Sequence, residues 1–169
     1  FFIVFFTKIK LVSFYSKMKK TILFAFSTAS SAATIPVTLK TVEEELGVEK
    51  SVASFSVPLG ATINMDGTAI MQGVATIFIA NAYGIDLNIS DFISVILIAT
   101  LASIGTAGVP GVGLIMLAMV LNQVGLPSEG IALIIGIDRL LDMTRTAVNV
   151  TGDAAISCVV ASSEKKINN

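Results

Sequence analysis

The stretch GTAGVPGVG, residues 105–113, interrupts the middle of an apolar run that extends over residues 92–121. Four glycines and a proline do not hold a continuous helix, because glycine is conformationally free and proline removes a backbone donor. The apolar segments on either side are each too short to cross a hydrocarbon layer of about 30 Å as a helix. The run therefore predicts a helical hairpin that enters a membrane and returns on the same side, with its tip at the glycines.

The composition is that of a membrane protein. Of the 169 residues, 54% are hydrophobic and 14% are charged, and the mean hydropathy is +0.86. A soluble domain carries about 25% charged residues, so the composition excludes a soluble enzyme. The net charge of -1 and the absence of a basic stripe exclude a nucleic-acid-binding protein. The chain has no histidine, and the lone Cys158 excludes an intrachain disulfide.

Three other apolar runs accompany this hairpin. Residues 21–39 are rich in Ser, Thr and Ala, residues 51–83 are interrupted by NMDGT at residues 64–68, and residues 126–161 contain several charges. As one straight helix, residues 51–83 would span about 50 Å, against a hydrocarbon layer of about 30 Å. We therefore expect a helix that either tilts and protrudes or is interrupted at residues 64–68.

The lysines indicate how these runs are oriented. All lie in residues 8–20, in residues 40–50 or in the carboxy-terminal tail, and none lies in residues 84–91 or 122–130. By the positive-inside rule, the first set of segments is cytoplasmic and the second is external. One hairpin then enters from each face. Such an inverted repeat is typical of transporters whose binding site lies near the membrane midplane.

The sequence thus predicts an all-α integral membrane fold with two re-entrant helical hairpins and two interrupted or polar transmembrane helices in an inverted repeat. Residues 1–20 are interpreted as the end of a preceding transmembrane helix and a cytoplasmic basic segment. Residues 21–83 contain the first hairpin and the interrupted helix, residues 84–161 the second hairpin and the last helix, and residues 162–169 a cytoplasmic tail. Because the chain begins with Phe1 in an apolar stretch, we expect it to be a carboxy-terminal piece.

The last apolar run carries polar side chains on one helical face. They fall within about 80° at about 100° per residue, and they are Asp138, Asp142, Arg145, Asn149 and Asp153. Because burying charges in a membrane is costly, this face is expected to contact protein, water or a bound ion. The Arg145 guanidinium matches a carboxylate and Asp142 matches an ammonium group, which together indicate an amino acid with an acidic side chain. The alternative is a structural ion pair between Asp142 and Arg145 at i, i+3.

NMDGT places an amide, a carboxylate and a hydroxyl inside an apolar helix. Unwinding there releases backbone carbonyls, which suit Na⁺. The alternative is a kink with Asp66 hydrogen-bonded locally. The tip of the first hairpin, STASSAAT at residues 27–34, can offer helix amino termini to an anion. The glycines of the second tip would let it move as a gate.

Four motifs in this order resemble those of the sodium:dicarboxylate symporter family of glutamate and aspartate transporters. They are the serine-rich first hairpin, GATINMDGT at residues 60–68, ASIGTAGVPG at residues 102–111 and DMTRTAVNVTGD at residues 142–153. The resemblance covers residues 21–164. It implies a multi-pass cell-membrane symporter that imports glutamate, aspartate or related dicarboxylates with sodium by elevator-like alternating access. It also implies a homotrimeric complete protein, of which this chain forms part of the transport domain, with no enzymatic activity and no cofactor besides the coupling Na⁺.

The resemblance further implies a substrate site between the two hairpin tips and the last helix. Arg145 would pair with the side-chain carboxylate of the substrate and Asp142 with its amino group. The other implied substrate contacts are Ser30, Ser31, Thr68, Val109, Thr146 and Asn149.

The same resemblance implies sodium sites. One would use the carbonyls of Gly60, Asn64 and Asn149 and the Asp153 carboxylate. A second would use Thr62, Met65 and the carbonyls of Ser103, Ile104 and Thr106. A third would involve Asn64 and Asp66 with an earlier helix.

Two features relate the chain to branches of the family. Arg145 resembles the acidic-substrate branch, and Asp153 with Asn-Met-Asp resembles the sodium-driven branch. The chain departs from the family in one respect, because many prokaryotic members carry arginine at the position of Ala29 and animal members at that of Met143. Arg139, one turn before Met143, is a candidate replacement.

Several alternatives stay open at this point. Within the family they are transport of cystine or neutral amino acids and coupling to protons. From other classes they are an ion channel with re-entrant pore loops, for which the Asp142 and Arg145 pair has no use, and an intramembrane hydrolase. A hydrolase with a hairpin serine as nucleophile lacks a histidine, and no lysine lies deep in an apolar run to act as base. The exact substrate and the ion stoichiometry are not determined by the sequence.

Overall fold

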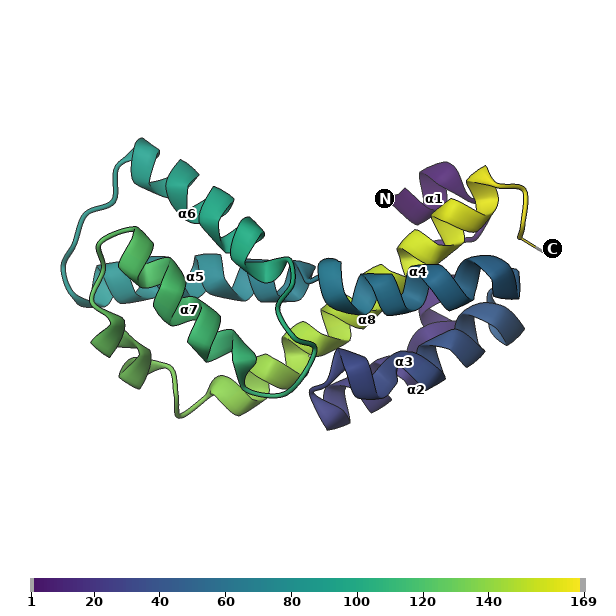
Figure 1. Ribbon diagram of the computed structural model, residues 1–169, viewed down its shortest axis with the longest axis horizontal. Helices are drawn as coiled ribbons and strands as arrows, with labels where there is room; N and C mark the ends of the chain where they lie inside the picture. Colours follow the sequence, from purple (N-terminus) through teal and green to yellow (C-terminus); the bar gives the residue numbers. More distant parts are fainter. Residues whose placement is uncertain (1, 168–169) are drawn as a thin grey trace.

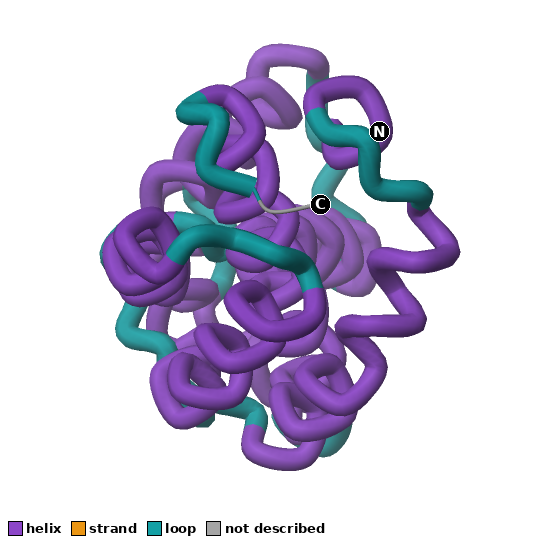
Figure 2. Tube along the Cα trace, turned by 90° about the vertical axis from the view of Figure 1, so that its right-hand side faces the viewer, coloured by secondary structure: helices purple, strands orange, loops and turns teal. Residues whose placement is uncertain are grey.

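The computed structural model describes residues 2–167, which form helices and loops (Figure 2). Within these residues, strand-like pairing is limited to one isolated antiparallel bridge between Val48 and Ile167. The helices are, in chain order, α1 (Phe2–Phe6), α2 (Leu11–Thr28), α3 (Ser31–Lys40), the π-helical turn η1 (Thr41–Glu45), α4 (Lys50–Ile63), α5 (Asp66–Ala82), α6 (Ile89–Ser103), α7 (Val112–Gln123), the 3-10 helix η2 (Ser128–Leu133) and α8 (Asp138–Ser163). The predicted helical class is confirmed.

Helix α8 extends from one group of helices, made of α5 to α7, to a second group made of α1 to α4 (Figure 1). The group α1 to α4 forms an apolar core with the carboxy-terminal half of α8, around Phe14, Met18 and Cys158. The group α5 to α7 has its own core, around Ile79, Leu117 and Leu121. Between the two cores the buried face of α8 is polar. The fold thus places a polar layer where its two halves meet.

Helices α2 and α3 form the first hairpin. Ala29 ends α2 in the left-handed conformation (φ 50°), and Ser30 caps α3 by accepting a hydrogen bond from the Ala33 amide at 3.1 Å. Helix α2 begins at Leu11, before residue 21 where the sequence predicts the apolar arm to start. The lysines at positions 17, 19 and 20 therefore lie on this helix.

Helices α4 and α5 follow each other nearly in line (Figure 1), with a break between them at Asn64 and Met65. Neither residue has helical dihedral angles, with φ and ψ of -99° and 73° for Asn64 and -106° and 48° for Met65. The remaining residues of the NMDGT motif form the first turn of α5. The structure therefore has the interruption that the sequence allows here, rather than one continuous helix.

Helices α6 and α7 form the second hairpin. Asn88 and Asp91 close a capping box at the start of α6. The connection over residues 104–111 contains Gly105 at φ 80° and Gly111 at φ 84°, a conformation that glycine adopts without steric cost. Residues 105–111 of the glycine-rich stretch therefore form the non-helical tip, as the sequence predicts, whereas Val112 and Gly113 already belong to α7.

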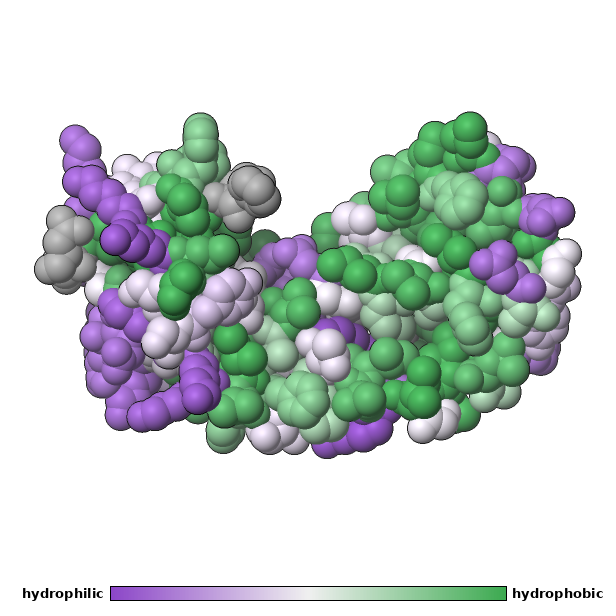
Figure 3. Space-filling view, turned by 180° about the vertical axis from the view of Figure 1, so that it is seen from behind, coloured by the Kyte–Doolittle hydropathy of each residue, from purple (hydrophilic) through white to green (hydrophobic). Residues whose placement is uncertain are grey.

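Helix α8 begins later than the apolar run that contains it. The run predicted over residues 126–161 starts with η2 and a turn, and the long helix begins only at Asp138. At its other end, Ser162 donates a hydrogen bond to the Phe6 carbonyl at 2.9 Å, which holds α1 beside the last turn of α8. Hydrophilic side chains gather at this end of the molecule, and apolar side chains cover much of the opposite end (Figure 3).

Among residues 2–167, no helix combines the length and the apolar character needed to cross a membrane. Large apolar side chains are nevertheless exposed along α6, where Ile89, Ile93, Ile96, Leu97 and Leu101 are each more than half exposed.

Candidate functional site

The two hairpin tips, the start of α5 and the polar face of α8 enclose a small cavity. Its lining comprises Ala29, Ser31, Met65, Thr68, Thr106, Ala107, Gly108, Val109, Val112, Gly113, Asp142, Arg145, Thr146 and Asn149. All the substrate residues expected from the sequence lie in this set except Ser30. The cavity volume is about 10 Å³, roughly the room that one water molecule needs.

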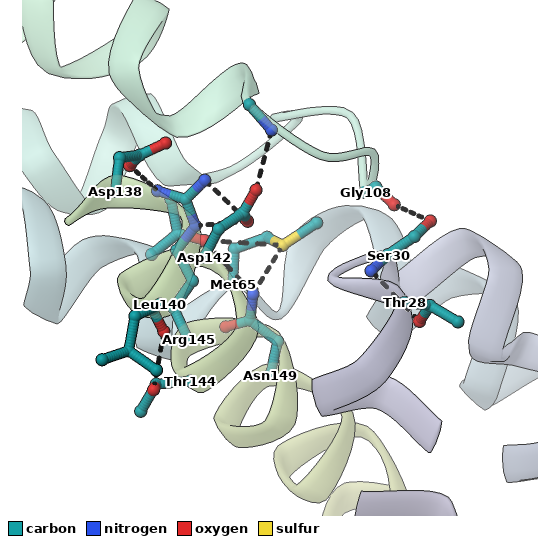
Figure 4. Close-up of polar contacts among 12 residues, drawn as sticks. Thr28, Ser30, Met65, Gly108, Asp138, Leu140, Asp142, Thr144, Arg145 and Asn149 are labelled. Carbon is teal, nitrogen blue, oxygen red and sulfur yellow. Dashed lines mark hydrogen bonds and ion pairs between the residues drawn. The ribbon is translucent and has the colours of Figure 1, made fainter. Parts of the chain in front are cut away.

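Arg145 and Asp142 form a buried ion pair on this face of α8. The Asp142 Oδ1 atom lies 2.8 Å from Arg145 Nη2 and accepts a hydrogen bond from Nε at 3.0 Å. On the other side, Nη1 lies 3.9 Å from Asp138 Oδ1, and neither atom has a hydrogen bond. Figure 4 shows the guanidinium between the two carboxylates. Two buried carboxyl groups thus face one guanidinium.

Asp142 also anchors the second tip. Its Oδ2 atom accepts a hydrogen bond from the Gly111 amide at 2.8 Å, at the residue that precedes α7. One carboxylate therefore holds both the guanidinium and the start of α7, and any group that competes for Asp142 acts on both.

The first tip contacts the second through Ser30. Its hydroxyl donates to the Gly108 carbonyl at 2.7 Å (Figure 4). The same carbonyl accepts from the Ala32 amide at 3.1 Å. Ser30 is therefore occupied by the contact between the tips and does not line the cavity, although the sequence predicts a substrate contact there. Ser31 lines the cavity instead.

Asn149 joins α8 to the break between α4 and α5. Its Oδ1 atom accepts from the Gly67 amide at 2.7 Å, and its Nδ2 atom donates to Thr68 Oγ1 at 3.2 Å and to Met65 Sδ at 3.1 Å. One amide thus satisfies an orphan donor at the start of α5 and fixes two side chains beside the cavity.

Asp153 faces the same break one turn further along α8. Asn64 Nδ2 donates to Asp153 Oδ1 at 2.9 Å, and a Cβ atom on Gly60 would lie 2.5 Å from that oxygen. Only glycine at position 60 allows the carboxylate to come this close to α4. The structure therefore brings together Gly60, Asn64 and Asp153, three of the residues expected around the first sodium ion.

The residues expected around the second sodium ion lie at the end of α4, at the break before α5 and where α6 leads into the second tip. The Gly105 amide donates to the Thr62 carbonyl at 3.0 Å, which joins the end of α4 to the tip. Met65 and Thr106 both line the cavity. The Ser103 and Thr106 hydroxyls donate to the backbone carbonyls of their own segment, at Thr100 and Ala102, and Ile104 is exposed.

The carboxylate expected at the third sodium ion lies elsewhere. Asp66 is exposed and lines a separate groove, together with apolar residues of α2 such as Ile22 and with Thr151 of α8. Asn64 is turned toward Asp153.

Comparison with protein families matches residues 1–163 to the model of the sodium:dicarboxylate symporter family. The chain belongs to this family. Its sequence motifs, its two hairpins and its broken helix are therefore those of a symporter-family chain. The relatives described next are named as transporters, not as enzymes.

Three relatives illustrate the similarity. The chain is 49% identical over 142 residues to the human excitatory amino acid transporter 2, and the aligned region covers 84% of this chain and 25% of the relative. It is 48% identical over 149 residues to the mouse excitatory amino acid transporter 3, with 88% and 28% covered. It is 52% identical over 130 residues to an excitatory amino acid transporter of Caenorhabditis elegans, with 77% and 26% covered. The chain thus spans about a quarter of the length of these relatives.

Several residues of this candidate site are not assigned a role by the sequence motifs. Asp138 belongs to the predicted polar stripe, but its approach to Arg145 is visible only in the structure. Gly108 and Gly113 line the cavity, and the glycine-rich composition alone does not say which glycine meets which side chain. Arg139, the candidate replacement for the missing arginine, is exposed and does not line the cavity.

Proposed function

We propose that this chain forms part of the transport domain of a sodium-coupled importer of glutamate or aspartate in the cell membrane. The observation that carries the proposal is the buried Arg145, held by Asp142 at a cavity between two hairpin tips. The family match and the names of the relatives, excitatory amino acid transporters, support the same substrate class.

The site suits an acidic amino acid by its charges. A guanidinium pairs with a carboxylate in a fork geometry, so Arg145 binds the substrate's side-chain carboxylate. Asp142, which pairs with Arg145 in the structure, then accepts hydrogen bonds from the substrate's amino group instead. Ser31, Thr146 and Asn149, with Thr68 and the backbone of Val109, surround the rest of the substrate.

The same charges favour coupling to cations. The site already carries two buried carboxyl groups against one guanidinium, and Asp153 adds a further buried carboxyl group close by. An acidic amino acid has a net negative charge, so its binding to this site is unfavourable without added positive charge. Sodium ions as co-transported cargo provide that charge, the first at Gly60, Asn64, Asn149 and Asp153, the second at Thr62, Met65, Ser103, Ile104 and Thr106, and the third at Asn64 and Asp66.

Access to the site requires the second tip to move. A cavity of about 10 Å³ does not hold an amino acid. Gly105 and Gly111 lie at the two ends of the tip in left-handed conformations, so they act as hinges when the contact between Ser30 and Gly108 opens. Elevator-like movement of the domain then exposes the site to the other side of the membrane.

The exposed apolar side chains of α6 fit a domain surrounded by lipid or by neighbouring helices. In this arrangement the two hairpins are re-entrant, one from each face, and α4–α5 and α8 cross the membrane. The complete transporter is a homotrimer.

Uptake of labelled L-aspartate into proteoliposomes that contain the complete transporter tests this function. We expect uptake that requires an inward sodium gradient and is blocked by excess L-glutamate. Equal uptake with a proton gradient and no sodium contradicts sodium coupling. Absence of aspartate uptake under both gradients, with uptake of cystine or a neutral amino acid, contradicts the acidic substrate.

A further inference from the structure

Gly113 lies directly against the guanidinium group of Arg145. It is a buried residue in the first turn of α7. A Cβ atom built on Gly113 would overlap Nη1 and Cζ of Arg145 and would lie 2.5 Å from Nη2. Non-bonded carbon atoms approach each other to about 3.5 Å. Any other residue at position 113 is therefore incompatible with the observed position of the guanidinium.

The contact involves the end of a side chain rather than the backbone. At Gly67, by contrast, an added Cβ would overlap the backbone of Arg145, so a substitution there disturbs the packing of α5 on α8. At Gly113 the overlapping atoms belong to a flexible side chain, which can move while the helices stay in place.

The guanidinium cannot move without losing its partners. Asp142 holds Nε and Nη2, and Asp138 lies 3.9 Å from Nη1. The start of α7 is itself tied to Asp142 through the Gly111 amide at 2.8 Å. Gly113 and the guanidinium are thus held in register by the same carboxylate, and a methyl group at position 113 forces them apart.

We propose that Gly113 is a specificity-determining position, which admits the Arg145 guanidinium to the cavity and so selects acidic over neutral amino acids. The proposal rests on the proposed function, in which this guanidinium binds the substrate's side-chain carboxylate. With alanine at position 113 the guanidinium is displaced from the cavity. Acidic substrates then lose their partner, whereas neutral amino acids, which have no second carboxylate, do not.

The test is a double-mutant cycle in the complete transporter, with L-aspartate affinity measured for wild type, G113A, R145A and the double variant. G113A is expected to weaken L-aspartate binding by about tenfold or more, as for loss of a charged hydrogen bond. In the R145A background the same substitution is expected to change the affinity by no more than about twofold, because the group that it displaces is gone. Competition by L-serine measures the neutral side of the selectivity, which is expected to shift toward the neutral substrate in G113A.

Gly73→Ala is the matched control. Gly73 lies inside α5, and a Cβ atom there would meet nothing within 4 Å. The Gly73→Ala variant reports the effect of replacing a helical glycine without displacing Arg145. Its L-aspartate affinity is expected to match that of wild type.

Each outcome bears on a separate statement. Equal affinities of G113A and G73A overturn the role of Gly113, as does a loss in G113A that persists undiminished in the R145A background. If G113A does not fold, the double variant is expected to fold, because the overlap is with the guanidinium. A double variant that also fails to fold overturns the proposal. A wild-type transporter without L-aspartate uptake overturns the proposed function and the specificity role with it, whereas wild-type uptake with unchanged G113A overturns the specificity role alone.

Discussion

Asn64 of the interrupted helix donates a hydrogen bond to Asp153 of α8 at 2.9 Å, across 89 positions of sequence. Gly60 leaves the space into which the Asp153 carboxylate fits. A buried carboxylate with one amide partner retains lone pairs for a cation, so this pair lies at the centre of the proposed ion coupling.

Asp153→Asn removes the negative charge and keeps the shape of the side chain. We expect the sodium concentration for half-maximal L-aspartate uptake to rise by about tenfold or more, since interactions with a charged group of this kind are worth about 1.5–3 kcal/mol. The measurement is the sodium dependence of uptake in proteoliposomes. Asp86→Asn, in the exposed loop between α5 and α6, is the control, and an unchanged sodium dependence in Asp153→Asn would falsify the role of this carboxylate.

Gly60→Ala tests the same site from the side of α4. The added Cβ atom would lie 2.5 Å from Asp153 Oδ1, so the carboxylate must turn away. We expect the sodium concentration for half-maximal L-aspartate uptake to rise, as for Asp153→Asn. Gly136→Ala, where a Cβ atom meets nothing within 4 Å, should behave as wild type. If both alanine variants are alike, the close approach of Gly60 to Asp153 has no functional consequence.

Arg145→Lys keeps the positive charge but loses the planar fork. A lysine ammonium does not reproduce two parallel hydrogen bonds to a carboxylate, so we expect L-aspartate affinity to fall by about tenfold or more. Equilibrium binding of labelled L-aspartate measures the change. Arg139→Lys, at an exposed position on the same helix, is expected to bind as wild type. Wild-type affinity in Arg145→Lys excludes Arg145 as the partner of the substrate carboxylate.

Ser30 has two contacts that substitution can separate. Its hydroxyl donates to Gly108 of the second tip and accepts from the Ala33 amide at the start of α3. Ser30→Ala removes both, with a loss of about 1 kcal/mol in stability from the helix cap. Ser30→Gly also removes the contact between the tips but costs only a few tenths of a kcal/mol at the cap.

We therefore expect both Ser30 variants to open the second tip and only Ser30→Ala to lower the melting temperature. The labelling rate of a cysteine placed at Thr106, which is buried at the second tip, measures the opening of the tip, after Cys158 has been replaced. Labelling that increases in Ser30→Ala but not in Ser30→Gly would show that the cap, and not the contact with Gly108, controls the tip.

The amino-acid sequence predicts those features that depend on near neighbours in the chain. The helical class, the interruption at Asn64 and Met65, the non-helical second tip and the polar face of α8 follow from hydropathy, from glycine and proline, and from helical spacing. The ion pair between Asp142 and Arg145 is also local, because residues at i and i+3 share a helical face. The start of α2 at Leu11 was not predicted, since lysines that indicate a cytoplasmic segment do not say whether that segment is helical.

The contacts that assemble the site depend on the tertiary structure. Ser30 meets Gly108 across 78 positions and Asp142 meets the Gly111 amide across 31, and Gly113 meets the Arg145 guanidinium from a different helix. No local pattern distinguishes a glycine that packs against a functional side chain from one that ends a helix. That distinction is made only when the two hairpins and α8 pack together, because the space that each glycine leaves is filled by a residue from another segment.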